Sequence, residues 1–207
     1  MNKTKKILAL VLSVFMLVAI SVVGTVAYLT STDTVNNTFT VGNVTITLDE
    51  TDVDTAGVPE EGADRVMEND YHLIPGHEYT KDPTIHVAAN SEACYVFVKV
   101  ENGLSAIEPE AGTDATIAEQ MEDNGWTLIS EGSNIYKYNA KVEKAEINQD
   151  LPVFETLTVK DDATNEELAE CAKTIKVTAC AIQAEGFADA AAAYAKLPSD
   201  FIGTTAE

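Results

Sequence analysis

The chain has 207 residues, of which 13 are basic and 34 are acidic, and its formal net charge is −21. This excess of carboxylates argues against binding to nucleic acid or anionic lipid, because both are bound mainly through Lys and Arg. An apolar fraction of 45% predicts a folded core rather than a disordered chain.

The first 27 residues have the pattern of an export signal. Three lysines among the first six residues precede an uncharged apolar run, Ile7–Ala27. A basic start followed by an apolar run and small residues predicts a secretory signal peptide, and we expect cleavage between Ala27 and Tyr28. A run of about 20 apolar residues can also span a bilayer, so a retained membrane anchor is the alternative.

Removal of residues 1–27 would leave an even more acidic chain. The segment contains three lysines and no acidic residue, so 10 basic and 34 acidic residues remain, a net charge of −24. The remaining length of about 180 residues suits one domain. We expect an extended polar arm at residues 28–38 and a globular domain over residues 39–207.

The first part of this domain is predicted to contain two strands and a loop. Alternating β-branched residues predict a strand at Phe39–Glu50. Residues 51–70 hold seven acidic residues together with Gly and Pro, which predicts a surface loop. A second strand is expected at Tyr79–Ala88, where Pro83 indicates an edge strand or a bulge.

The strongest strand signal in the chain is Cys94–Glu101, which is apolar on both faces. Such a strand is expected to lie centrally, in a sandwich or under a helix, and to bury Val98. Residues 126–130 and 134–139 predict a hairpin, and Thr174–Gln183 predicts another long strand.

Three short helices are also predicted. They are expected at Ala115–Glu122, Asn165–Cys171 and Phe187–Leu197. Asn124 and Gly125 end the first, and Pro198 is expected to close the last, since proline interrupts a helix.

The pattern as a whole predicts an all-β fold. Val153–Val159 alternates in the manner of a further strand. Many short strands separated by turn signals predict an antiparallel β-sandwich or jelly roll with short helical insertions and a short C-terminal helix.

Three cysteines, an odd number, exclude complete disulfide pairing within one molecule. Cys94 and Cys180 both lie in predicted strands and could pair if those strands are neighbours. The alternative is that Cys94, Cys171 and Cys180 are all free thiols.

The sequence contains no established catalytic motif, and we expect no active site. Zinc peptidases commonly use two histidines one helical turn apart, as in HExxH, and this pattern is missing. The histidines are His72, His77 and His86, and a three-histidine metal site and ordinary surface histidines are the two interpretations.

Calcium is the one ion that the sequence suggests. Asp49, Asp52 and Asp54 place carboxylate oxygens, the ligands that calcium prefers, in one short segment. The spacing of an EF-hand is not met, and a solvated acidic loop is the alternative. We expect no other cofactor.

Short motifs along the chain carry a family resemblance. They are Gly24–Thr30, Asp33, Asn37–Val44, Leu73–Gly76, Lys81–Pro83, Ala89–Glu92, Lys176–Gln183 and Gly186-Phe187. In this order they resemble the TasA/camelysin family of Firmicutes exported proteins, whose signal peptides are processed by a SipW-type signal peptidase.

The resemblance implies a secreted jelly-roll subunit of the Gram-positive cell surface, extracellular matrix or biofilm. It implies homo-oligomers or fibres in which the N-terminal arm of one subunit, with Tyr28, Val35 and Phe39, completes the sheet of the next. Pairing of the arm with its own domain, or a flexible stalk, is the alternative. The camelysin branch implies a different function, a surface metallopeptidase. Contact with the membrane is expected only through the signal segment.

Overall fold

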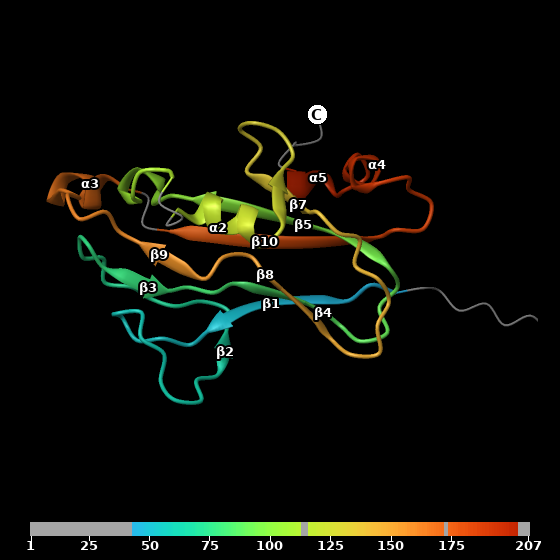
Figure 1. Ribbon diagram of the computed structural model, residues 1–207, viewed down its shortest axis with the longest axis horizontal. Helices are drawn as coiled ribbons and strands as arrows, with labels where there is room; N and C mark the ends of the chain where they lie inside the picture. The colour runs from blue at the N-terminus through green and yellow to red at the C-terminus, as the bar shows by residue number, and fades with distance from the viewer. Residues whose placement is uncertain (1–42, 113–115, 172–173, 203–207) are drawn as a thin grey trace, which may run out of the picture. The chain divides into compact units, whose positions relative to one another are not determined.

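The computed structural model describes residues 43–112, 116–171 and 174–202. These residues form mostly antiparallel strands with a few short helices, so the predicted all-β class is confirmed (Figure 1). The predicted signal segment and arm lie outside the described residues. Within them, no helix is long and apolar enough to cross a membrane.

One sheet has four strands in the order β2-β1-β4-β8, all antiparallel to their neighbours. Its strands are β1 (Ile46–Thr51), β2 (Arg65–Val66), β4 (Thr84–Val87) and β8 (Gln149–Pro152). In β1, Ile46 and Leu48 pack against the main core, as their alternation predicts. The loop expected at residues 51–70 contains the short strand β2.

The second sheet has the order β10-β5-β7-β6 and is also antiparallel. Its strands are β5 (Cys94–Asn102), β6 (Trp126–Leu128), β7 (Ile135–Tyr138) and β10 (Ile175–Gln183). β5 pairs with β10 over nine residues and with β7 on its other side, so β5 is central and Val98 is fully buried. The predicted hairpin is β6 and β7.

A small third sheet consists of β3 (Glu78–Thr80) and β9 (Thr156–Thr158). The strand expected at Tyr79–Ala88 is thus two strands in different sheets, separated around Pro83, which has no N–H to donate to a ladder. Of the strand expected at Val153–Val159, only the part that forms β9 is a strand. Residues 153–155 are not in a strand, because there the chain leaves β8 and crosses to the small third sheet.

The described helices are short, and three of them begin at a polar side chain that caps the first turn. They are η1 (Ser105–Ile107, a 3-10 helix), α2 (Ile117–Asp123), α3 (Asn165–Glu170), α4 (Ala190–Tyr194) and α5 (Ser199–Ile202). Thr116 and Thr164 each start a helix with a capping box. The single helix expected at Phe187–Leu197 is instead α4, and Pro198 precedes α5, because proline is tolerated at a helix start.

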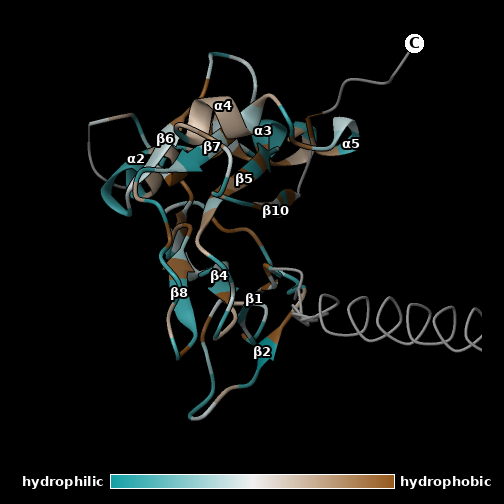
Figure 2. Ribbon diagram, turned by 90° about the vertical axis from the view of Figure 1, so that its right-hand side faces the viewer, coloured by the Kyte–Doolittle hydropathy of each residue, from teal (hydrophilic) through white to brown (hydrophobic). Residues whose placement is uncertain are grey.

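Two apolar clusters cover the two faces of the β5–β10 sheet. The main core joins this sheet to the strands of the other two and includes Val98, Ile85 and Leu157. The second cluster includes Phe97 and lies under α4 and α5 (Figures 1 and 2). The two-sided apolar pattern of β5 therefore reflects a sheet on one face and helices on the other.

The cysteines are free thiols. Cys94 packs in the main core, whereas Cys180 lies opposite Phe97 and belongs to the second cluster, on the other face of the sheet. The two thiols therefore point away from each other, and a Cys94–Cys180 disulfide does not form. Burial raises the pKa of Cys94 to about 11, which keeps this thiol protonated at neutral pH.

Candidate functional site

The edge strand β10 is the longest open element of the described fold. Among the described strands it pairs only with β5, and at nine residues it is longer than the other edge strands, β2, β6 and β8. Natural proteins usually cover, shorten or pair such an edge, because its unpaired backbone groups can bind another strand.

The register of β10 shows which of its backbone groups face the open side. Gly103 N–H donates to Thr174 O, and Ala184 N–H donates to Ala93 O. These bonds fall on directly opposed residues of the antiparallel pair, so even-numbered residues bond to β5. The odd-numbered residues of β10 therefore direct their N–H and C=O groups to the open edge.

Side chains along β10 are half-buried rather than enclosed. Ile175, Val177 and Ala179 pack against the main core, and Cys180 and Ile182 pack against the second cluster. An edge that is apolar along one face and over part of the other suits a further strand whose side chains also need cover.

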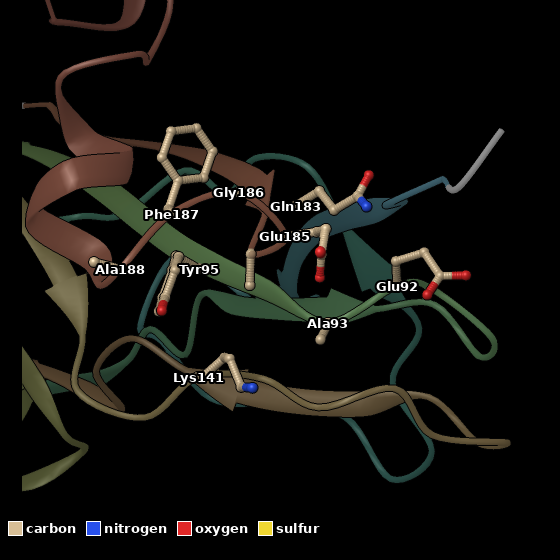
Figure 3. A pocket seen from close by; sticks show the side chains of 10 residues that line it. Glu92, Ala93, Tyr95, Lys141, Gln183, Glu185, Gly186, Phe187 and Ala188 are labelled. Carbon is tan, nitrogen blue, oxygen red and sulfur yellow. The ribbon is translucent and has the colours of Figure 1, made fainter.

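Surface hollows border both ends of β10. Near its start, a hollow of 570 Å³ is lined by residues that include Tyr71, Lys81 and Ile175. Near its end is a hollow of 690 Å³, and Figure 3 shows Tyr95, Lys141 and Gln183 among the residues that line it. The described residues that line this second hollow include no histidine, serine or cysteine.

A polar cluster, the inner cluster, consists of the buried Glu50 and Lys81 and the half-buried Asn69 and Tyr71. Lys81 Nζ lies 2.6 Å from Glu50 Oε2, and Asn69 Nδ2 donates to Glu50 Oε1 at 3.0 Å. Glu50 is 6% exposed and Lys81 is 9% exposed. The lysine also lies 5.3 Å from the centre of the Tyr71 ring. Burial raises the pKa of Tyr71, and the negative charge of Glu50 raises it further.

An exposed network, the outer cluster, occupies the other face of β1 and consists of Asp49, Arg65, Asp82, His86 and Asp150. Arg65 Nε lies 2.6 Å from Asp49 Oδ1, and Arg65 Nη1 lies 2.8 Å from Asp82 Oδ2. His86 bridges two strands, with Nε2 at 2.9 Å from Asp49 and Nδ1 at 2.6 Å from Asp150.

The outer cluster raises the pKa of His86 and lowers the pKa of Asp49. Partial burial lowers the pKa of His86, but its hydrogen bonds to Asp150 and Asp49 outweigh that effect and raise the pKa above its ordinary value. Partial burial likewise acts to raise the pKa of Asp49, but Arg65 and His86 lower it overall.

The three carboxylates proposed for calcium have separate environments. Asp49 belongs to the outer cluster, whereas Asp54 Oδ1 accepts hydrogen bonds from the N–H groups of Ala56 and Val58, both at 2.9 Å. Asp52 and Asp54 line a shallow acidic hollow that does not include Asp49. In the described ranges, no three His, Cys, Asp or Glu side chains are grouped to hold a metal. Calcium binding stays a prediction.

The three histidines also have different neighbours. His77 Nε2 lies 2.9 Å from Ala56 O, and its ring meets Tyr79 edge-on at 4.4 Å. His72 O accepts the hydroxyl of Tyr79, and the ring of His86 bridges two aspartates. The metallopeptidase alternative likewise stays a prediction.

Two groups of predicted site residues lie outside the described residues. These are the expected cleavage position, Ala27 and Tyr28, and the assembly arm with Val35 and Phe39. Comparison with protein-family models, with curated proteins and with solved structures gives no match to the chain. The TasA/camelysin resemblance is therefore a hypothesis that depends on the motifs alone.

Sequence reasoning missed the inner cluster, although part of its signal was present. Glu50 continues the inward alternation of Ile46 and Leu48, and Lys81 continues that of Tyr79. A charged residue at an inward position requires a partner, so each could have been marked. Asn69 lies in a loop, where no periodicity identifies it.

Proposed function

We propose that this chain is an exported structural or interaction protein of the cell surface or biofilm matrix, which self-assembles by donating its N-terminal arm to a neighbouring subunit. The observation that supports this proposal best is the open edge of β10, which is nine residues long, packs one face against the main core and packs Cys180 and Ile182 of its other face against the second cluster. The two four-stranded sheets, joined by the main core, also favour an antiparallel β-sandwich of the jelly-roll type.

Addition of a strand to β10 would satisfy the backbone groups that face its open side. An arriving strand forms main-chain hydrogen bonds, which supply affinity, while alternate side chains enter the flanking grooves and supply specificity. In the predicted arm, Val35 and Phe39 are four residues apart and share one face of an extended strand. We infer that these two side chains contact the groove beside Ile175 and Val177.

Charge opposes this assembly. Processed subunits would each carry a net charge of −24, and like-charged molecules repel at low ionic strength. Salt screens the repulsion, acid protonates carboxylates, and calcium neutralises them. Assembly is therefore expected to require at least one of these conditions.

The test compares the processed protein with two variants at about pH 5 with added calcium. We expect fibres of the intact protein in electron microscopy and a rise in light scattering. Deletion of residues 28–38 should leave a monomer under every condition.

A substitution in β10 provides the second arm of the test. Ala179→Pro removes one N–H from the open edge and leaves the even-numbered ladder to β5 intact, so this variant should fold and fail to assemble. A monomeric intact protein under all conditions would exclude the fibre proposal. Fibres formed by the arm deletion would exclude the arm as the donated strand.

A further inference from the structure

The inner cluster holds an amine and a carboxamide on the two oxygens of one carboxylate. Glu50 Oε2 accepts from Lys81 Nζ at 2.6 Å, and Glu50 Oε1 accepts from Asn69 Nδ2 at 3.0 Å. One buried carboxylate thus contacts both a nucleophilic nitrogen and the nitrogen of an acyl group that this amine could attack.

Asn69 is also held at both ends of its amide. The Val53 N–H donates to Asn69 Oδ1 at 3.0 Å, and Asn69 Nδ2 donates to Thr51 O at 2.8 Å. A backbone N–H on the carbonyl oxygen stabilises the negative charge that would develop there during nucleophilic attack. The same hydrogen bonds also fix the orientation of the amide.

Burial favours reaction over solvation at this position. Glu50 and Lys81 are more than nine-tenths buried, and the aromatic ring of Tyr71 lies beside the lysine. Lys81 Nζ lies 2.6 Å from Glu50 Oε2, so a proton can pass directly between the two groups. Reacting groups held in fixed proximity behave as if one were present at an effective concentration of about 10⁵ M or more.

We propose that Lys81 and Asn69 form an intramolecular isopeptide bond, with Glu50 as the catalytic proton carrier. The inference is independent of fibre formation.

The step balances without a cofactor, oxidant or reductant. Glu50 accepts a proton from Lys81 Nζ, and the neutral amine attacks Asn69 Cγ. A C–N bond forms, and the oxyanion is stabilised by the Val53 N–H. Glu50 then returns this proton to Asn69 Nδ2, the bond from Cγ to Nδ2 breaks, and ammonia leaves. The attacking nitrogen gives its second proton to Glu50, which passes it to the departing ammonia, so the released species is an ammonium ion. The product is a secondary amide between the two side chains.

This bond would tie the loop that follows β2 to the junction between β3 and β4. Residues 69–81 become a closed ring, which restricts the unfolded chain in the same sense as a disulfide and does not depend on redox conditions. For an exported chain whose cysteines are free, such a cross-link supplies covalent reinforcement by another chemistry.

Intact-mass spectrometry of the secreted, folded protein tests the proposal directly. We expect a mass lower than the sequence mass by one ammonia molecule. After trypsin digestion, cleavage after Lys81 should be missing, so that residues 66–99 remain one peptide, without backbone fragments between Asn69 and Lys81 in tandem spectra.

Variants locate the reacting groups. Lys81→Met, Asn69→Ala and Glu50→Gln should each restore the full sequence mass, whereas Asn69→Asp should lose water in place of ammonia. Lys144→Met is the matched control, because Lys144 pairs with Glu92 at 2.7 Å on the surface, and it should keep the ammonia loss.

Two outcomes would overturn the proposal. The first is a full sequence mass for the wild-type protein, a result that does not depend on whether any variant folds. The second is an ammonia loss that persists in Lys81→Met, which would indicate cyclisation of an asparagine onto its own backbone.

Discussion

Two adjacent residues of β1, Asp49 and Glu50, hold their cations at the same 2.6 Å yet lie in different surroundings. Glu50 faces inward and pairs with Lys81, and both are almost completely buried. Asp49 faces outward and pairs with Arg65, whose side chain is 35% exposed. The comparison teaches that distance alone does not set the importance of an ion pair. Access of water decides which pair responds to salt and pH.

The largest expected effect is loss of one partner in the inner cluster. Lys81→Met leaves Glu50 buried without a cation, and breaking a buried pair in this way costs about 3–5 kcal/mol of unfolding free energy. Urea denaturation measures the difference, with Asn69→Ala as the reference background, because that variant cannot form the proposed amide.

A second substitution checks the cause of that loss. Adding Glu50→Gln to Lys81→Met removes the uncompensated charge and should recover much of the lost stability. If Lys81→Met alone lowers the unfolding free energy by less than about 1 kcal/mol, the buried ion pair contributes no more than an exposed one.

An intermediate effect is expected from pH in the outer cluster. The folded-state pKa of His86 is raised above 6.5, so its stabilising contribution is fully present below pH 6.5 and is lost as pH rises through the raised value. The pKa of Asp49 is lowered from 3.8, so its contribution is present above pH 3.8 and is lost as pH falls through the lowered value. The network is therefore most stabilising between pH 3.8 and 6.5.

The measurement compares the urea midpoint of the wild-type protein with that of His86→Gln from about pH 6 to about pH 9. Asp49 and Asp150 contact the ring and Arg65 contacts Asp49, and all three residues are unchanged in the variant, so the difference isolates the imidazole. The advantage of the wild type should shrink as pH rises. A constant difference over this range would show that folding does not raise the pKa of His86.

The smallest effect is expected from Arg65→Met. Exposed ion pairs contribute up to about 1 kcal/mol and are weakened by salt. The stability difference from wild type should therefore decrease in high salt, as it should for the surface control Lys144→Met. A loss of stability several times larger and independent of salt would show that Arg65 behaves like a member of the inner cluster.

The sequence predicted those parts of the fold that depend on local pattern. The two-sided apolarity of Cys94–Glu101 predicted the central strand and the burial of Val98, and both are confirmed. Pro83 indicated an edge strand or a bulge, but the division of this segment into β3 and β4 in different sheets depends on distant partners. β2, with only two residues, is too short to show any period.

The candidate site was less predictable, because its parts meet through long-range contacts. Edge position cannot be read from Ile175–Gln183, since the local alternation of a strand does not say how many neighbours it has. Asn69 reaches Glu50 and Val53 only through the path of the intervening loop. The alternation of their strands identifies Glu50 and Lys81 as inward-facing charged residues, but it does not show that the two contact each other.

The order of strands in the first sheet has a mechanical consequence. In an assembled fibre, tension along the arm would enter the domain at Asn43 and pass into β1, whose ladder to β4 extends from Ile46 to Asp49. Antiparallel hydrogen bonds lie perpendicular to the strands, so a pull along β1 loads them together in shear. Bonds loaded in this way share the force, so the ladder of β1 would resist the pull with all its hydrogen bonds together, and these bonds would not break one after another.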